Sequence, residues 1–379
     1  MQPIRILQVF TTMGRGGAES MIMNYYRHID KTKIQFDFLV HREGSAAFDA
    51  EIEQLGGVIY RLPEINPIFP QNYYNALREF FKTHHTYKIV HSHLNTFSCF
   101  PLKVAEEFNI PVRIAHAHIA MDPINIKTTL KSKANFIEAI KKIIKIQVKK
   151  KIHKHSTHRF ACGIKAGKWL FGEQMPFKVM NNAINAKTFV YNPSLSEQLK
   201  KEFQIDNQTV LGHIGRFTHQ KNHEYLIRIF AEVLKINKNF ILILIGDGHL
   251  DDQIKRLTEK LEVSNQVKFL GLRTNIPELL QLIDIFVFPS FYEGLPVTLI
   301  EAQAAGVKIL ASDTITKEVQ LTDDIHYLSI DLKPQYWANT VVSLVPFEKK
   351  NNLKQITDGN YDITENALNI ENFYIQHYK

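Results

Sequence analysis

The chain has 379 residues, and its 46 Lys and Arg against 38 Asp and Glu give a formal net charge of +8. This length fits about two domains, and a content of 45% hydrophobic and 22% charged residues excludes disordered and collagen-like proteins. The two cysteines, Cys99 and Cys162, are far apart and outside any CxxC pair. Their spacing excludes a disulfide framework and a cysteine zinc site and indicates a reducing, cytoplasmic environment.

Two features bear on export and membranes. The first ten residues contain no apolar segment followed by a small-residue cleavage site, so we expect no secretion signal. The longest apolar runs, such as Phe240–Ile245, are far shorter than the roughly 20 residues that span a bilayer. We therefore expect a chain that does not cross a membrane.

Short runs rich in β-branched residues alternate with helical patterns along the whole chain, which predicts βαβ units, parallel sheets and the α/β class. The predicted strands of the first half are Ile4–Phe10, Phe36–Val40, Val58–Leu62, Ile89–His93, Val112–His118 and Phe160–Cys162. Those of the second half are Thr209–Gly215, Phe240–Gly246, Val267–Leu270, Ile285–Pro289 and Lys308–Ala311.

The segment Val179–Pro193 separates the two series of strands. Its Asn and Pro residues mark turns, and no clean periodicity runs through it, so we place the domain boundary here, with domains at residues 1–180 and 181–362. Each domain is predicted to be a doubly wound, Rossmann-like sheet that binds ligands beyond the carboxyl ends of its strands. Two such domains facing each other would form a central cleft.

A glycine-rich turn follows the first predicted strand, with Gly14, Gly16 and Gly17 ahead of an expected helix. Glycines let backbone amides approach an anion at a helix N-terminus, where the helix dipole is favourable. A dinucleotide fingerprint would need a third glycine where this chain has Glu19, which disfavours a dehydrogenase. A plain strand-to-helix turn is the alternative.

A basic pair, Arg216 and Lys221, follows Gly215 after the first predicted strand of the second half. On a strand-to-helix loop these cations can hold a diphosphate, Arg through its planar fork and Lys as a point charge. A solvated charge pair is the alternative.

Two glutamates flank the start of a later helix, Glu293 in the loop before Pro296 and Glu301 in the second helical turn. We expect the amides of Gly294 and Leu295 to point at a ligand, and the two carboxylates can accept hydrogen bonds from sugar hydroxyls. An ordinary exposed helical residue is the alternative for Glu301, but its apolar neighbours make a glutamate there unusual without a partner.

Two histidine pairs, His91 with His93 and His116 with His118, lie at the carboxyl ends of predicted strands. Residues i and i+2 share one face of a strand, so the pairs could bind zinc, but carboxylate ligands have no obvious source. Hydrogen bonds to an acceptor or a sugar are favoured. The chain has no Asp-x-Asp to anchor a phosphate-bridging metal, no phosphate loop and no GxSxG. We therefore predict no metal and disfavour an NTPase or an α/β-hydrolase.

The stretch from Lys127 to His155 holds ten lysines against the single acid Glu138. Its apolar residues follow helical spacing beside a lysine stripe, which is typical of a helix that binds an anionic membrane surface. A helix packed on its own domain with a solvated lysine face is the alternative. Nucleic acid is not an expected partner, because aromatic residues are scarce here and no recognition motif accompanies the charge.

The chain resembles family-four retaining glycosyltransferases of the GT-B fold in the order and spacing of Gly16-Gly17-Ala18-Glu19, Gly215-Arg216 with Lys221, Gly246-Asp247-Gly248, and Glu293 with Glu301. The resemblance covers nearly the whole chain. The stretch Ser312–Val319 is similar to the branch that builds bacterial capsular and exopolysaccharide repeat units. The chain departs from the family pattern at Asn182-Ala-Ile-Asn185 and at Lys308, neither of which belongs to the expected donor clamp.

The resemblance implies roles for the residues of the second half. Arg216 and Lys221 would hold the donor diphosphate and stabilise the charge that develops as it leaves. Glu301 would bind the ribose. Glu293 and the two amides before Pro296 would hold the donor sugar.

The resemblance also implies roles in the first half, which would bind the acceptor. Gly16 and Gly17 would shape the floor where donor and acceptor meet. The active-site histidine of the family would be His118 or His116, and we prefer His118. Residues 363–379 would form a helix that crosses back onto the first domain.

The implied activity is metal-independent, retaining transfer of a hexose from a nucleotide sugar, expected to be a UDP-sugar, to a hydroxyl of a glycan or lipid-linked acceptor in cell-surface polysaccharide synthesis. No cofactor beyond this co-substrate is expected. The enzyme would be cytoplasmic and peripheral on the inner face of the plasma membrane. The alternatives are a nucleotide-sugar epimerase, which would need no acceptor, and a catalytically silent nucleotide-binding subunit.

Overall fold

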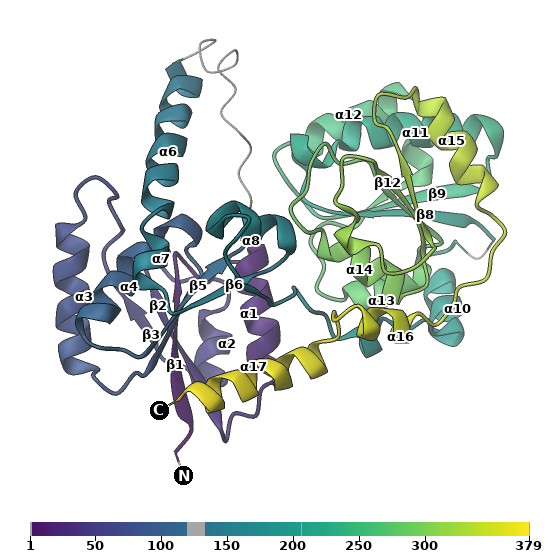
Figure 1. Cartoon of the computed structure of the whole chain (residues 1–379). Helices are drawn as coiled ribbons and strands as arrows, with labels where there is room; N and C mark the ends of the chain where they lie inside the picture. Colours follow the sequence, from purple (N-terminus) through teal and green to yellow (C-terminus); the bar gives the residue numbers. More distant parts are fainter. Residues whose placement is uncertain (1, 120–132, 206, 379) are drawn as a thin grey trace. The chain divides into compact units, whose positions relative to one another are not determined.

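A computed structural model of the protein describes residues 2–119, 133–205 and 207–378, with side chains from Lys141 onward in the helix that begins at Lys133. The chain forms two compact units (Figure 1). The first unit comprises Met1–Ala183 together with Ile363–Lys379, and the second comprises Ile184–Asp362. The lysine-rich stretch predicted from Lys127 onward lies outside the described residues as far as Ser132.

The first unit contains a parallel sheet in the order β3-β2-β1-β4-β5-β6-β7. All six strands predicted in this half are present, within a few residues of their predicted ends. The pair Lys178–Val179 adds a short edge strand that the sequence pattern did not predict. The strands are β1 (Ile4–Phe10), β2 (Ile34–Val40), β3 (Ile59–Arg61), β4 (Ile89–Ser92), β5 (Val112–Ala117), β6 (His158–Ala161) and β7 (Lys178–Val179).

Helices cover both faces of this sheet because side chains of a strand alternate between its faces. Ile6 and Phe10 of β1 join one core, and Leu7 and Val9 join the other. The first core is covered by α1 (Gly17–His28), α2 (Asp49–Gln54) and α17 (Ile363–His377). The second is covered by α3 (Gln71–Thr83), α4 (Cys99–Glu107), α6 (Lys133–Lys149), α7 (Ile152–His155) and α8 (Ile164–Phe171).

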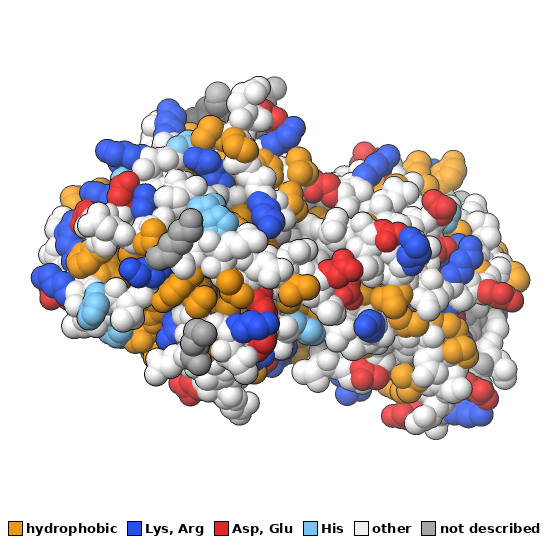
Figure 2. Space-filling model, turned by 60° about the horizontal axis from the view of Figure 1, so that its bottom comes forward, with side chains coloured by type: hydrophobic (Ala, Val, Ile, Leu, Met, Phe, Trp, Pro, Cys, Tyr) orange, Lys and Arg blue, Asp and Glu red, His pale blue; other side chains and the backbone are white. Residues whose placement is uncertain are grey.

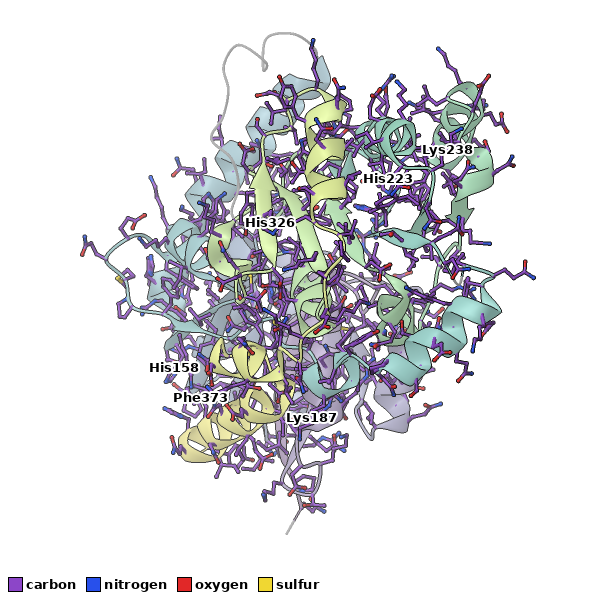
Figure 3. All side chains as sticks on the ribbon, turned by 90° about the vertical axis from the view of Figure 1, so that its right-hand side faces the viewer. His158, Lys187, His223, Lys238, His326 and Phe373 are labelled. Atoms are coloured by element: carbon purple, nitrogen blue, oxygen red, sulfur yellow. The ribbon has the colours of Figure 1, made fainter. Side chains whose placement is uncertain are left out.

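The C-terminal helix α17 packs against the first unit, although it follows the second unit in the chain. Phe373 of α17 meets His158 of β6 edge to face, with ring centroids 5.2 Å apart, and both residues are labelled in Figure 3. Tyr374, the next residue, is fully buried in the same core. The end of the chain therefore supplies side chains to the interior of the N-terminal sheet.

The second unit contains a parallel sheet in the order β10-β9-β8-β11-β12-β13. The five strands predicted here are present, and β13 was not predicted. The strands are β8 (Thr209–Ile214), β9 (Phe240–Ile245), β10 (Val267–Phe269), β11 (Ile285–Phe288), β12 (Lys308–Ser312) and β13 (Ile325–Leu328). One face is covered by α9 (Ala186–Phe189), α10 (Pro193–Glu202), α13 (Ile276–Leu282), α14 (Val297–Ala304) and α16 (Leu353–Asp358), and the other by α11 (His223–Ile236), α12 (Asp251–Lys260) and α15 (Pro334–Ser343).

Each sheet has a point where the strand order reverses, between β1 and β4 in the first unit and between β8 and β11 in the second. Doubly wound sheets bind ligands outside the carboxyl ends of the strands at such a point. The glycine turn follows β1, and the first histidine pair ends β4. The Arg216 loop follows β8, and the Glu293 loop follows β11. Every motif singled out from the sequence, apart from the lysine-rich stretch, therefore lies at or beside one of these two points.

Candidate functional site

In the second unit, the loops after β8 and β9 pack tightly together and leave Arg216 exposed. Gly246 has a φ of +135°, and a Cβ there would lie 2.2 Å from the Gly215 carbonyl oxygen, so position 246 needs glycine. The Phe217 amide donates to the Asp247 carbonyl at 2.6 Å. Arg216 makes no ion pair with any residue in the described part of the chain. Its guanidinium is therefore available to an anion.

Lys221 is held beside the switch point by an ion pair and a ring. Its Nζ lies 2.8 Å from Glu293 Oε1 and 4.5 Å from the centroid of the Phe288 ring. Only 16% of the Lys221 side chain and 9% of the Glu293 side chain are exposed. The structure thus brings together two predicted site residues that are 72 positions apart, with little competing solvent.

Backbone and amide contacts tie the loop after β8 to the loop after β11. The Phe291 amide donates to the Gln220 carbonyl at 2.9 Å, and Gln220 Nε2 donates to the Tyr292 carbonyl at 3.0 Å. Asn222 Nδ2 donates to the Pro289 carbonyl at 3.1 Å. These contacts fix the two loops relative to each other and so hold Lys221 and Glu293 in position.

Gly215 leaves room for the Lys221 side chain. A Cβ at this position would lie 3.0 Å from His213 Nε2 and 3.1 Å from Lys221 Cε. His213 is fully buried, and its Nδ1 donates to the Val287 carbonyl at 2.8 Å, which leaves Nε2 as an acceptor without a partner among the described residues. Any side chain at Gly215 would therefore displace Lys221 or strain the strand beneath it.

Glu301 lies in α14 among the buried side chains of Leu299, Ile300 and Ala302. Burial raises the pKa of its carboxyl group from 4.5 to about 7. No ion pair joins it to another described residue. The carboxylate is therefore costly to ionise in the free protein, and hydrogen-bond donors on a ligand would offset this cost.

The residues before α14 present unused donors. The helix begins at Val297, and Pro296 is its N-cap residue. Neither the Gly294 nor the Leu295 amide donates to an acceptor within the described ranges. A bound oxygen could accept from both amides.

In the first unit, Gly16 caps α1 and Gly17 begins it. A Cβ on Gly16 would lie 2.2 Å from Glu19 Oε2, because the Glu19 side chain folds over the start of the helix. Burial raises the pKa of Glu19. Gly17 is exposed, and a Cβ there would have open space within 4 Å. The turn therefore requires a small residue at Gly16, and Gly17 leaves an open surface above the start of α1.

The four histidines of the two pairs come together at the carboxyl ends of β4 and β5. His91 Nε2 lies 3.0 Å from His116 Nδ1, and His93 Nδ1 lies 2.9 Å from His118 Nε2. Burial lowers the pKa of all four rings, that of His118 to about 3. His91, His93 and His116 are buried, whereas His118 is partly exposed. Of the two predicted candidates, His118 is the one that a ligand can reach.

Ring nitrogens of His91, His93 and His116 lie within 4.8 Å of one another, close enough for a metal site in principle. Most of these nitrogens are already used in hydrogen bonds, and no carboxylate joins the group to balance the charge of a buried divalent ion. The arrangement therefore suits a neutral hydrogen-bonded cluster better than a metal.

The sequence analysis missed several polar residues around both switch points. Gln8 and Tyr374 contact the histidine cluster in the first unit, and the buried ring of His223, labelled in Figure 3, lies 4.7 Å from that of His213 in the second. Gln8 alone left a signal, as a polar residue between the apolar Leu7 and Val9 of β1. Tyr374 gave none, because only the fold brings α17 back to β4.

The family model described as "Glycosyl transferases group 1" matches residues 196–345. The chain is 32% identical over 379 residues to EpsF of Bacillus subtilis (strain 168), which is named as a glycosyltransferase, and the alignment covers 98% of this chain and 96% of EpsF. It is 23% identical over 383 residues to CapH of Staphylococcus aureus, named as a capsular polysaccharide biosynthesis glycosyltransferase, with coverage of 98% and 99%.

Two further comparisons concern substrates and fold. An Escherichia coli enzyme named UDP-Gal:alpha-D-GlcNAc-diphosphoundecaprenol alpha-1,3-galactosyltransferase is 27% identical over 224 residues, with 55% of this chain and 56% of the enzyme covered. The crystal structure of Anabaena Alr3699/HepE in complex with UDP and glucose has a TM-score of 0.73 at 18% identity, with coverage of 98% and 100%. The last comparison supports the two-sheet architecture.

Proposed function

Because the chain belongs to the group 1 (family-four) glycosyltransferases, which have the GT-B fold, we propose that it transfers a sugar from a UDP-sugar to a hydroxyl of a glycan or lipid-linked acceptor, with retention of configuration and without a metal. The second unit binds the donor, and the first binds the acceptor. The observation that carries the proposal is the pairing of Lys221 with Glu293 at the β8–β11 switch point, on the loop that also carries the exposed side chain of Arg216.

In this proposal, protein cations stabilise the leaving group. Arg216 and Lys221 neutralise the diphosphate as its bond to the anomeric carbon breaks. The acceptor oxygen bonds to that carbon from the same face, and the hydroxyl proton passes to the departing phosphate oxygen. Preorganised cations in a site with little solvent stabilise such charge strongly. Loss of one contact of this kind costs on the order of 10² to 10³ in rate.

The remaining donor contacts use the two glutamates and the amides before α14. Glu301 accepts hydrogen bonds from the ribose hydroxyls. Glu293 and the amides of Gly294 and Leu295 bind the donor sugar. The relative from Escherichia coli, whose name gives a UDP-sugar as donor, supports UDP as the nucleotide.

The acceptor side of the proposal rests on the first unit. The surface above Gly16 and Gly17 receives the acceptor, and His118 hydrogen-bonds to a sugar hydroxyl. The same Escherichia coli relative acts by name on a diphosphoundecaprenol-linked sugar, which supports a lipid-linked acceptor. CapH supports a place in cell-surface polysaccharide synthesis.

A lipid-linked acceptor requires access to a membrane, and α6 is the element that we propose provides it. Within the described ranges, no helix is both long enough and apolar enough to span a bilayer. In Figure 1, α6 runs outward from the sheet of the first unit. Ile144, Val148 and Ile152 pack into that unit, whereas Ile143 and Ile146 are 49% and 36% exposed.

Lysines surround the exposed isoleucines of α6. Lys141, Lys145 and Lys150 make no ion pair with any described residue, whereas Lys149 donates to the Trp169 carbonyl and lies over its ring. On the face of the second unit in Figure 2, basic and acidic side chains are interspersed. We propose that α6 docks on anionic lipid at the cytoplasmic face of the plasma membrane.

The proposed function is tested by a thermal-shift screen of nucleotide sugars, followed by mass analysis of the product on a diphosphate-lipid-linked acceptor and NMR of its anomeric configuration. We expect stabilisation by one UDP-sugar, one added sugar residue and a retained anomer. Conversion of the UDP-sugar without an acceptor would favour the epimerase. UDP-sugar binding without turnover on any acceptor would favour the silent subunit, and an inverted product would refute retention.

A further inference from the structure

We infer that Gln8 is a positioning residue: its side-chain amide sets the proton arrangement of the four-histidine cluster, so that His118 presents a ring-nitrogen lone pair that accepts a hydrogen bond from a sugar hydroxyl. The inference rests on the proposed function and deepens it, since it states which kind of substrate group His118 takes. All the residues involved belong to the first unit.

The first arm of the network runs from Gln8 to His118. Gln8 Oε1 lies 2.9 Å from His93 Nε2, and because an amide oxygen only accepts, that nitrogen carries the proton. A neutral imidazole has one donor and one acceptor, so His93 Nδ1 is a lone pair. It lies 2.9 Å from His118 Nε2, which must therefore donate. The proton of His118 is thus on Nε2, and Nδ1 is left as an acceptor.

The second arm runs from the same amide to His116. Gln8 Nε2 donates to the Tyr374 hydroxyl at 3.4 Å, and that hydroxyl lies 2.7 Å from His91 Nδ1. If Tyr374 donates to His91 Nδ1, then His91 Nε2 donates to His116 Nδ1 at 3.0 Å. His116 Nε2 ends this arm, buried and without a partner among the described residues.

Burial keeps the four rings neutral. One amide can therefore determine which ring nitrogens carry the protons. Burial lowers the pKa of each ring, and the rings also disfavour charge on one another, so none is protonated near neutral pH. No carboxylate among the described residues hydrogen-bonds to any of the four rings. The carbonyl oxygen of Gln8 is therefore the fixed reference for the first arm, which ends at His118.

The exposed end of the first arm is the one that a substrate can use. His118 is partly exposed, and its Nδ1 has no partner in the described part of the chain, while the backbone amide of His118 is held by Asn95 Oδ1 at 2.7 Å. A lone pair there accepts from a hydroxyl and repels a phosphate oxygen. His118 is therefore suited to bind a sugar hydroxyl and not a phosphate oxygen of the diphosphate. A reversed Gln8 amide would invert this preference.

The test reads the tautomer directly by NMR of protein labelled with ¹⁵N and ¹³C in histidine, with the His118 signals assigned by their loss in His118→Gln. We expect the Nε2–H tautomer for His118 in the wild-type protein. Gln8→Met removes both amide contacts at nearly constant volume, so the His118 signals should shift toward a mixture of tautomers. Transfer should fall about tenfold or more, mainly in kcat.

Tyr374→Phe is the matched control, because it cuts only the second arm. The His91 and His116 signals should change, while His118 keeps the Nε2–H tautomer. Gln8→Leu, which removes both amide contacts as Gln8→Met does, should give the same mixture of tautomers and serves if Gln8→Met fails to fold. An Nδ1–H tautomer of His118 in the wild type, or an unchanged tautomer in folded Gln8→Met, would overturn the inference. Because these signals need no turnover, they remain informative even if no transferase activity is found.

Discussion

Lys221 Nζ lies 2.8 Å from Glu293 Oε1, so in the ligand-free protein the proposed diphosphate-binding cation is paired with the proposed sugar-binding carboxylate. Both side chains are mostly buried, and Phe288 covers the pair. The carboxylate holds the amine in place, and a bound diphosphate must share that amine. The contact of Lys221 with the diphosphate and the contact of Glu293 with the sugar are therefore coupled.

This coupling predicts that substitutions of Lys221 and of Glu293 have opposite effects on the binding of UDP alone. Lys221→Ala should weaken UDP binding by about tenfold to a hundredfold, because a charge-assisted contact is lost. Glu293→Gln should strengthen UDP binding a few-fold, since the amine no longer has a competing anion. Both variants should transfer sugar on the order of 10² times more slowly. Calorimetry with UDP measures the binding, and weaker UDP binding by Glu293→Gln would argue against the coupling.

The space above Gly215 predicts that Gly215→Ala displaces Lys221. The added methyl group would meet His213 Nε2 and Lys221 Cε at about 3 Å, closer than normal contact. We expect UDP binding to weaken by about tenfold, which corresponds to roughly 1.4 kcal/mol. Gly44→Ala is the matched control, because a Cβ there has open space. Unchanged UDP affinity in folded Gly215→Ala would contradict this account of the loop.

The raised pKa of Glu301 predicts that donor affinity depends on pH. Its carboxyl group titrates at about 7, so most molecules carry the ionised form at pH 8 and the protonated form at pH 6. Because only the carboxylate accepts from two ribose hydroxyls, the KM for the UDP-sugar should rise several-fold as pH falls over this range. Glu301→Gln should remove the rise. A wild-type KM that stays constant between pH 6 and 8 would exclude the ribose contact.

The same pKa predicts a pH effect on stability. The folded state holds the Glu301 proton more tightly than the unfolded state, in which the group titrates near 4.5. The resulting stabilisation is complete below pH 4.5 and is lost as pH rises through about 7. Glu301→Gln should therefore gain stability over the wild type when pH is raised from 5 to 8. Differential scanning calorimetry of both proteins at each pH measures this gain.

The proposed membrane contact predicts that charge on α6 controls binding to lipid. Replacing Lys141, Lys145 and Lys150 with Gln should abolish flotation with vesicles containing phosphatidylglycerol, since each basic residue contributes about 1 kcal/mol. Replacing Lys235, Lys238 and Lys260 with Gln removes equal charge from the second unit and should leave flotation unchanged. An equal loss of flotation in both variants would indicate that the protein binds the vesicles through its net charge alone.

Stabilisation of the leaving group by protein cations predicts activity in the presence of a chelator. EDTA should leave the rate of transfer unchanged, because Arg216 and Lys221 take the place of a divalent ion. Loss of activity with EDTA that Mn²⁺ restores would contradict this mechanism. Apparent inactivation must be checked by circular dichroism, so that unfolding is not taken for loss of a metal.

The amino-acid sequence by itself determined the strands and the motif positions. Eleven of the strands follow from their apolar runs, because a parallel strand buried on both faces is apolar along most of its length. Of the four strands at sheet edges, β3 and β10 were predicted, whereas β7 and β13 were not. β7 has only two residues, and β13 carries His326 among its apolar residues, so neither forms an apolar run of its own. The glycines after β1 and the charged residues after β8 and β11 marked the switch points, because these patterns too are contained in single short stretches of sequence.

Only the tertiary structure decided which of these residues meet. Spacing could not tell His116 from His118, because both lie on one face of β5, whereas their burial differs through their neighbours. Tyr374 reaches His91 across 283 positions of sequence because α17 returns to the first sheet. Contacts at such separation depend on the packing of whole elements, and no local pattern of residues encodes them.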